Sequence, residues 1–306
     1  MNRAIKPNDR KWNLNITGKI SLMAEALNNE ETIGNYAKSR TIVGMDGELR
    51  NVISGASLRH NYQLHLKSQF SPDELCGTCR LFDPMKNGAL SGEIKGLSAS
   101  GNRTHHCPVC DIMGFMNPDK TNSQKRSSPL LMADAISDTD GTRQAFTRNR
   151  VDTHPEKEDS TMMIWQEEVR TSTYNFAAQL DLSRLFFDDE NLKYTTNDVD
   201  KIAERAGKAI RAYIQAFLDI TGAKMAAHMP HLIGIEGVVT EITDGSQVAT
   251  KYSALNEDYI AVHQAVENYA PEFQSAAEFQ HVMAEFLDEA YLKEMAARNL
   301  RYLNQL

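Results

Sequence analysis

The sequence predicts an α+β protein in which strands and helices follow the order strand, helix, strand, strand, helix, strand. Two periodicities indicate these elements. Apolar residues recur at every second position in some segments and at every third or fourth position in others. A third observation is that all four cysteines lie in one Gly-rich insertion that interrupts this order. The order is that of a split βαβ core, which is the ferredoxin-like topology.

The first strand and the first helix are indicated near the N-terminus. Apolar and polar residues alternate over 14–22, which is the pattern of a half-buried strand. The polar stretch 24–47 is expected to form a long loop. A helix is predicted over 56–68, where apolar side chains share one face, and Ser54 is placed to cap its first turn.

The core resumes after the insertion with the apolar run 129–135. The polar excursion that follows, 137–160, can be an extended hairpin or a loop. The clearest strand of the chain covers 173–182, because aromatic and aliphatic side chains occupy alternate positions there.

An amphipathic helix is predicted over 199–218, and Gly222 is placed to end it. A further strand is expected over 232–242. The C-terminal region is predicted to be helical, because Ser275-x-x-Glu278 forms a capping box ahead of an apolar stripe that recurs every three or four residues.

These elements divide the chain into parts. Residues 1–69 and 128–250 form the core, with the excursion at about 137–160 projecting from it. Residues 70–127 form the cysteine-bearing insertion, and 251–306 form the helical C-terminal region.

Composition indicates a globular, water-soluble protein. The hydrophobic fraction of 41% and the charged fraction of 24% are ordinary for this class. No apolar run is long enough to cross a bilayer, and residues 1–12 lack the apolar segment of a signal peptide. A cytoplasmic location without a membrane partner is therefore expected.

Charge is distributed unevenly along the chain, whose net charge is −8. Residues 1–150 hold 20 basic and 15 acidic residues, which leaves 13 basic and 26 acidic residues for the remainder. Such asymmetry favours an anionic partner for one half. An uneven but simply solvated surface would give the same counts.

The cysteines form two Cys-x-x-Cys pairs, namely Cys76 with Cys79 and Cys107 with Cys110. Four thiolates suit a tetrahedral Zn²⁺, and a reducing compartment favours metal binding over disulfides. We expect the zinc to be structural, since four thiolates leave no open coordination position. His105 or His106 could replace one cysteine, and a metal-free set of thiols is the alternative.

Cationic and polar residues recur at loops that border the predicted sheet. The helix start at Ser54 and Gly55 exposes backbone N–H groups, which attract phosphate. The cations near these loops are Lys38, Arg40, Arg59, His60, Arg143, Arg148, Arg150, Lys224, His228 and His231. A shared groove for a nucleic-acid backbone is one interpretation, and separately solvated side chains are the other. The chain lacks the aromatic motif with which RNA-recognition domains stack bases, so Tyr174 and Phe176 are expected in the core.

Five segments together resemble one family. They are Leu27–Tyr36, Ile53–His60, Cys107–Gly114, Ser128–Ala135 followed by Arg148–Asp152, and Thr221–Lys224 with Pro230–His231. Their order and spacing, over about 14–242, resemble the backbone subunit of type I CRISPR Cascade complexes. That subunit belongs to the RAMP superfamily, and the DevR-like branch is the most similar.

The resemblance implies an RRM-like palm with a zinc-binding finger and a thumb hairpin. It also implies a non-catalytic subunit that polymerises along a guide RNA as a helical filament and holds the duplex of guide and target DNA strand beside other Cascade subunits. Base pairing would then read the sequence, while the protein holds the backbone. The implied RNA-contact residues are Lys38, Arg40, Ser54, Gly55, Ser57, Arg59, His60, Arg148, Arg150, Lys224, Met225 and His228.

Two other functions remain open. RAMP subunits that cut target RNA use an Asp in the loop after the first strand, whereas this chain has only Glu25, Glu30 and Glu31 there. A metal-dependent ribonuclease that uses these glutamates is therefore one alternative. A zinc-ribbon DNA-binding regulator that acts alone is the other.

Overall fold

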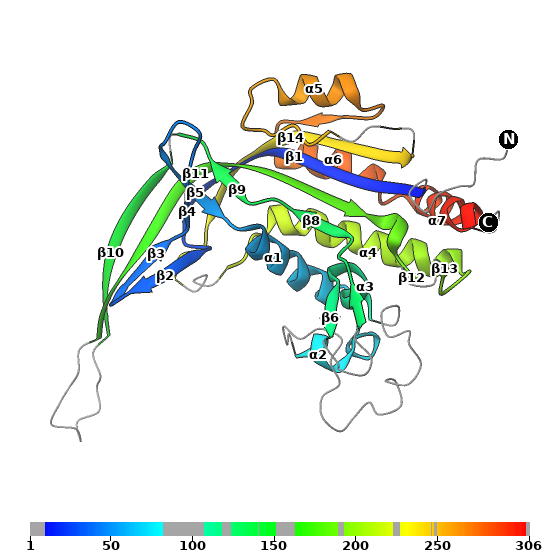
Figure 1. The fold of residues 1–306 in the computed structure, drawn as a ribbon, viewed down its shortest axis with the longest axis horizontal. Coiled ribbons are helices and arrows are strands. Elements are labelled where there is room, and N and C mark those ends of the chain that lie inside the picture. The colour runs from blue at the N-terminus through cyan, green and yellow to red at the C-terminus, as the bar shows by residue number, and fades with distance from the viewer. Residues whose placement is uncertain are drawn as a thin grey trace.

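The computed structural model describes residues 10–81, 107–117, 124–139, 141–150, 163–188, 193–222, 227–245, 247 and 250–303. The architecture is mixed α+β, and a large, mainly antiparallel sheet forms its centre (Figure 1). None of the helices in the described part of the chain combines the length and apolarity that a membrane span needs.

Three long strands make the middle of the sheet. β1 (Arg10–Glu25) lies between β14 (His231–Asp244) and β11 (Met163–Asp181) and is antiparallel to both. The strands expected over 14–22 and 173–182 are present and their apolar members are buried, but the half-burial expected for 14–22 is wrong, because Asn15 and Thr17 are buried as well. Gly18 allows β1 and β14 to approach closely, since a Cβ there would stand 2.2 Å from a backbone oxygen of Glu236.

Short strands extend the sheet on both sides. β8 (Leu130–Met132) and β9 (Ala135–Ser137) pair antiparallel with the far edge of β11. β5 (Leu49–Ile53) and β4 (Thr41–Val43) continue from β9, and β15 (Glu272–Phe273) follows β14 at the other edge.

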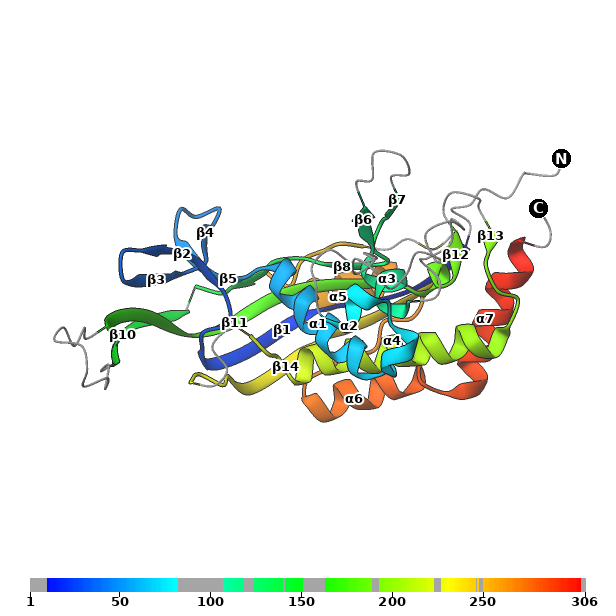
Figure 2. The same ribbon diagram turned by 90° about the horizontal axis from the view of Figure 1, so that it is seen from below.

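The long helices pack on one face of this sheet (Figure 2). These are α1 (Gly55–Ser68), α4 (Val199–Leu218), α6 (Ala276–Glu285) and α7 (Glu289–Leu303), whose apolar sides share one core with the strands. α5 (Tyr259–Val266) packs on the opposite face, where Tyr259 contacts Val238 in a separate small cluster. The predicted helical C-terminus is thus part of the main core.

Both expected helix caps are present. The Ser54 Oγ accepts a hydrogen bond from the Ser57 N–H at 3.2 Å, and the Ser275 Oγ accepts one from the Glu278 N–H at 3.2 Å. The Glu278 carboxylate in turn accepts from the Gln274 N–H at 2.7 Å.

Two predictions on local structure are wrong. Residues 24–47 are not a long loop, because they include the hairpin of β2 (Asn29–Ile33) and β3 (Tyr36–Ser39) as well as β4. β2 is mostly exposed, so no apolar alternation reveals it. Gly222 does not end α4, which ends at Leu218. Glycine is needed at 222 for packing instead, since a Cβ would stand 2.7 Å from the Leu27 side chain.

The polar excursion forms a hairpin. β10 (Thr142–Arg150) pairs antiparallel with 163–171, the first half of β11, and β3 pairs parallel with β11 at 166–167. This projecting hairpin (142–150 and 163–171) extends beyond the helices, at the left end of Figure 1.

Smaller elements complete the described chain. They are the 3₁₀ turns Pro72–Glu74 and Leu182–Arg184, helices α2 (Gly77–Arg80) and α3 (Pro108–Met113), and the hairpins of β6 (Phe115–Asn117) with β7 (Gln124–Arg126) and of β12 (Phe187–Asp188) with β13 (Lys193–Tyr194).

A buried ion pair lies where the projecting hairpin leaves the central sheet. The Arg170 Nε lies 2.6 Å from the Glu25 Oε1, and its Nη2 donates to Oε2 at 3.0 Å. Both side chains are fully buried. The Tyr174 hydroxyl and the Leu27 N–H also donate to this carboxylate. The Arg170 Nη1 donates to the carbonyls of Arg40 and Val52.

Burial is the largest single influence and lowers the pKa of the Arg170 guanidinium, but the acidic neighbours, Glu25 first among them, together outweigh burial and leave that pKa raised. The same burial raises the pKa of Tyr174 well above its ordinary value. The cluster is therefore a charged pair with a neutral phenol, and its hydrogen bonds join β1, β5, β11 and the segment after β3.

We predict that Glu25→Gln lowers the free energy of unfolding by about 3–5 kcal/mol, because it leaves the Arg170 charge buried without a counterion. Urea denaturation followed by circular dichroism measures this change. Lys293→Gln, which removes exposed ion pairs on α7, is the control and should leave the midpoint nearly unchanged. Equal midpoints for Glu25→Gln and wild type would refute the prediction.

Candidate functional site: a thiolate cluster and the RNA-contact residues

The four cysteines meet in one cluster. Cys76 and Cys107 precede α2 and α3, and each helix carries the second cysteine of its pair within its first turns. The Cys110 Sγ lies 3.6 Å from that of Cys76 and 3.5 Å from that of Cys79, and all four sulfurs lie within 4.8 Å of one another. The thiols are not joined in disulfides.

These separations fit a metal site. Four sulfurs at the Zn–S distance of about 2.3 Å form a tetrahedron whose edges are about 3.8 Å. Three of the cysteines are buried and Cys76 is half-buried, so water has little access. Hydrogen bonding within the cluster lowers the pKa of Cys76 and Cys107 and raises the pKa of Cys79 and Cys110, so the spacing of the sulfurs is what supports a metal site. His105 and His106 lie outside the described residues.

Asp111 joins this cluster to the core. Its carboxylate is fully buried and lies 2.7 Å from the Arg126 Nη2 and 2.9 Å from the Arg205 Nη1. It also accepts the Phe186 N–H at 3.0 Å. Burial lowers the pKa of Arg205, and the charge of Asp111 opposes that shift. The residue after Cys110 is therefore bound to β7, to α4 and to the turn before β12.

Arg126 and Arg205 make further contacts that join the cluster to the core. Arg126 donates to the carbonyls of Asp111, Phe187 and Arg184 at 2.7–2.8 Å. The Arg205 guanidinium lies 3.5 Å from the centre of the Phe186 ring, in a cation–π contact. The thiolate cluster is thus held rigidly against the helical layer.

The N-terminus of α1 already has internal partners. The Gly55 N–H donates to the Asp134 Oδ1 at 2.7 Å, and the Ser57 N–H donates to Ser54. Ser54 is itself buried, and its N–H donates to the Asn28 side chain. A phosphate at this helix end would therefore lie beside the carboxylate of Asp134.

The cations around α1 and β3 differ in their exposure and in their contacts. The Arg59 guanidinium donates to the Met113 carbonyl at 2.9 Å, and burial lowers its pKa, so it links α1 to α3. His60 is exposed on α1. Lys38 lies on β3 within 4 Å of Glu30 and Glu31, and Arg40 is exposed after β3.

The structure brings Arg148 and His228 together at Glu167, which was not predicted as a site residue. Both contact the Glu167 carboxylate, with the His228 Nε2 at 2.8 Å from Oε1. The Arg150 side chain, Lys224 and Met225 lie outside what the structure describes. Arg148 is on the projecting hairpin and Arg59 faces α3, so these candidates do not form one compact cluster.

Glu25 cannot serve as the metal ligand of a nuclease as it stands, because it is fully buried against Arg170. Glu30 and Glu31 are exposed on β2, near Lys38. Among the described residues, the grouping suited to a metal is the four-cysteine cluster. Glu167 and Asp111 were missed because their basic partners lie elsewhere along the chain, and only the fold places those partners beside them.

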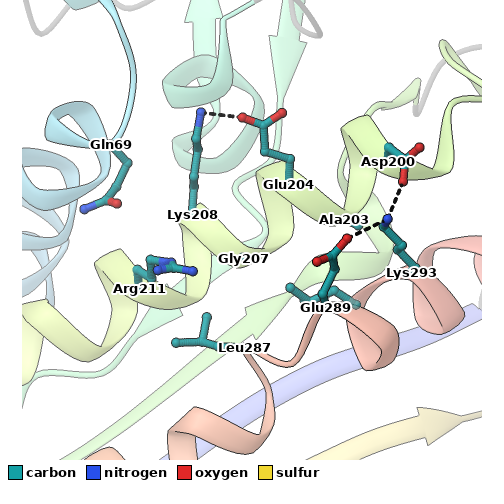
Figure 3. Close-up of a pocket in the computed structure, with 11 residues that line it drawn as sticks. Gln69, Asp200, Ala203, Glu204, Gly207, Lys208, Arg211, Leu287, Glu289 and Lys293 are labelled. Atoms are coloured by element: carbon teal, nitrogen blue, oxygen red, sulfur yellow. Dashed lines mark ion pairs between the residues drawn. The ribbon is translucent and has the colours of Figure 1, made fainter.

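A groove of about 650 Å³ lies between α4, α7 and the end of α1 (Figure 3). Its rim is charged, and apart from Arg211, which is exposed there, its basic groups pair with acidic ones. Lys208 binds Glu204 at 2.8 Å, and Lys293 binds Glu289 at 2.7 Å and Asp200 at 3.0 Å. The groove therefore offers no concentrated positive charge for a nucleic acid.

These features define a class of protein: a mixed α+β sheet protein with an inserted thiolate cluster and a projecting hairpin. The family model described as CRISPR-associated negative auto-regulator DevR/Csa2 matches residues 16–264. The CRISPR-associated protein Cas7/Cst2/DevR of Thermoproteus tenax (strain ATCC 35583) is 26% identical over 269 residues, which cover 80% of this chain and 78% of that protein. The chain belongs to the DevR/Csa2 family of CRISPR-associated proteins.

Solved structures share the fold. A chain of a structure described as a CRISPR RNA-guided surveillance complex, pre-nicking, has a TM-score of 0.51 and 13% identity, with 84% of this chain and 89% of that chain covered. A chain of a second CRISPR RNA-guided surveillance complex has a TM-score of 0.50 and 15% identity, with 94% and 99% covered. The family that the sequence segments resembled is thus confirmed.

We predict that the purified chain carries about one zinc ion and that Cys110→Ser loses most of it, because the cluster then keeps only three thiolates. Elemental analysis of the dialysed protein measures the metal. Leu81→Ser is the control, since Leu81 is exposed beside α2 and offers no ligand. Full zinc retention by Cys110→Ser would contradict this site.

Proposed function

We propose that this chain is a non-catalytic, guide-RNA-binding backbone subunit of a CRISPR surveillance complex. The observation that carries the proposal is the match to the DevR/Csa2 family over 16–264, together with the shared fold over most of a chain from such a complex. In this proposal the subunit polymerises along the guide RNA in the cytoplasm and contacts the target DNA strand and other Cascade subunits.

The strand order supports an RRM-like palm. β14, β1, β11 and β8 lie side by side and antiparallel, as in a split βαβ sheet whose helices are α1 and α4. We infer that 1–69 and 128–250 form this palm, that 70–127 form a zinc-binding finger and that the projecting hairpin is the thumb. The zinc is structural, because four thiolates complete its coordination.

The projecting hairpin supports contact with RNA. Arg143 and Phe146 are exposed on β10 and, three residues apart, lie on opposite faces of the strand, so one face offers a cation for a phosphate and the other an aromatic ring for a base. Lys38, Arg40 and His60 supply further polar contacts in the proposal, whereas the N–H groups at the start of α1 already donate to Asp134 and Ser54. The Arg59 side chain contributes indirectly, by holding α1 against α3.

The hairpin of β4 and β5 supports contact between copies of this chain. Ile42, Val43, Met45 and Leu49 on β4, β5 and their turn are 44–109% exposed. Apolar groups gathered this way are typical of a surface that an assembly covers.

The test of the proposal is whether the chain purified from cells of its own CRISPR system carries RNA of uniform length. We expect such RNA, and its dissociation constant should rise steeply with salt. Heterogeneous RNA, or none, would overturn the proposal. Discrete cuts in complementary RNA with Mg²⁺ would favour a ribonuclease instead.

A regulator is the second candidate, because the matching family model carries the description of a negative auto-regulator. It requires sequence-preferring binding of duplex DNA by the chain alone. Footprinting without guide RNA distinguishes the two, since a guide-dependent subunit protects no specific duplex by itself.

We predict that Arg143→Gln weakens the binding of unrelated single-stranded RNA sequences by a similar factor and lowers the slope of log K against log salt by about 1. Fluorescence anisotropy over a salt series measures both. Lys293→Gln lies on α7, at the opposite end of the molecule from β10 in Figure 1, and should change neither value. A loss confined to one RNA sequence would mean that Arg143 reads bases.

A further inference from the structure

Glu167 lies on the projecting hairpin and binds groups from two directions. On β10, Phe146 is its cross-strand partner in the register, and the Arg148 guanidinium forms an ion pair with its carboxylate. From outside the hairpin, the His228 Nε2 approaches the Glu167 Oε1 to 2.8 Å. The Glu167 side chain is only 4% exposed, although most of β10 is exposed.

His228 belongs to the segment that leads into β14. Three residues later, His231 pairs with Met23 at the end of β1. The His228 ring also lies 6.5 Å from the Phe146 ring, centroid to centroid. Through Glu167, the projecting hairpin is therefore braced against the start of β14, on the opposite side of β1 from β11.

The hairpin has further contacts at its base, where Arg170 binds Glu25, and along the β2–β3 hairpin, where the Asn35 side chain donates to the Ile164 carbonyl. β3 pairs with it at 166–167, and Glu168 accepts hydrogen bonds from the Tyr36 hydroxyl and the Ser39 N–H on that side. Glu167 and Glu168 point to opposite faces of β11, because successive strand residues alternate. The pair of glutamates thus holds the hairpin from two faces.

We propose that Glu167 is a positioning residue, which fixes the direction in which the projecting hairpin leaves the sheet and so places its exposed side chains on RNA. The placing of side chains on RNA rests on the proposed function, whereas the direction of the hairpin does not. Arg148 and His228 act through this brace rather than as free phosphate ligands, because a buried carboxylate already binds both.

The alternative is that Glu167 only neutralises Arg148 and His228, and it predicts the opposite change in RNA affinity. If Glu167 merely neutralised two phosphate-binding cations, its removal would free them and RNA would bind more tightly. If it positions the hairpin, removal loosens the hairpin and RNA binds more weakly.

The experiment compares wild type, Glu167→Ala, Glu167→Gln, His228→Ala and the double variant Glu167→Ala with His228→Ala, all as full chains. Amide hydrogen exchange without RNA reports on the hairpin, and anisotropy with a labelled single-stranded RNA reports on binding. We expect faster exchange over 142–150 and 163–171 in Glu167→Ala, with exchange over 173–181 unchanged. RNA binding should weaken about tenfold at an unchanged salt slope.

Two comparisons separate a positioning role of Glu167 from a pure charge effect: the conservative variant Glu167→Gln, and the double-mutant cycle of Glu167→Ala with His228→Ala. Glu167→Gln keeps an acceptor oxygen for Arg148 or His228 and should recover part of the affinity. The double variant should be little worse than either single one, because both remove the same brace. Tighter binding with a steeper salt slope in Glu167→Ala, or strictly additive losses, would overturn the proposal.

Failure of the brace and failure of the proposed function give different results. If wild type does not bind RNA, the proposed function fails, while the exchange rates still decide whether Glu167 braces the hairpin. If wild type binds RNA and Glu167→Ala leaves both exchange and affinity unchanged, only the brace is refuted.

Discussion

The buried pair of Glu25 and Arg170 is the interaction on which the arrangement of this protein depends. An ion pair without access to water is stable only if its remaining hydrogen-bonding groups are also satisfied. Here they are satisfied by Tyr174, by the Leu27 N–H and by the carbonyls of Arg40 and Val52. Meeting that requirement forces β1, β5 and β11 to converge at one point. The projecting hairpin and the β2–β3 hairpin both leave the sheet from this point, so its geometry sets their origin.

Asp111 plays a comparable part for the insertion. Because it follows Cys110 directly, its contacts with Arg126 and Arg205 fix the thiolate cluster to the helical layer. Glu167 has a similar role at the projecting hairpin, where its buried carboxylate joins Arg148 on β10 to His228 before β14. In each case a buried acid with cationic partners, rather than apolar contact alone, joins a peripheral part to the sheet.

The long strands, α1 and α4 were predictable, because their apolar residues recur with a clear period in the sequence. The thiolate cluster was equally predictable, since the spacing of Cys76 and Cys79 brings both sulfurs toward one ion. The β2–β3 hairpin was not, because β2 is mostly exposed and the short β3 is half-buried along its length, so no apolar alternation marks either strand. Of the residues expected at RNA, Arg59 showed why charge alone misleads: half-buried, it supports a neighbouring helix.

The sequence by itself determined the α+β class, the order of the core elements, the metal-type ligand set and the family resemblance, because each depends on residues close together along the chain or on their order. Only the tertiary structure decided which charged side chains bind one another inside the molecule. Ion pairs such as Glu25 with Arg170 join residues 145 positions apart. No local pattern encodes such a distance, and the cost of leaving a charge buried alone is what makes these pairings specific.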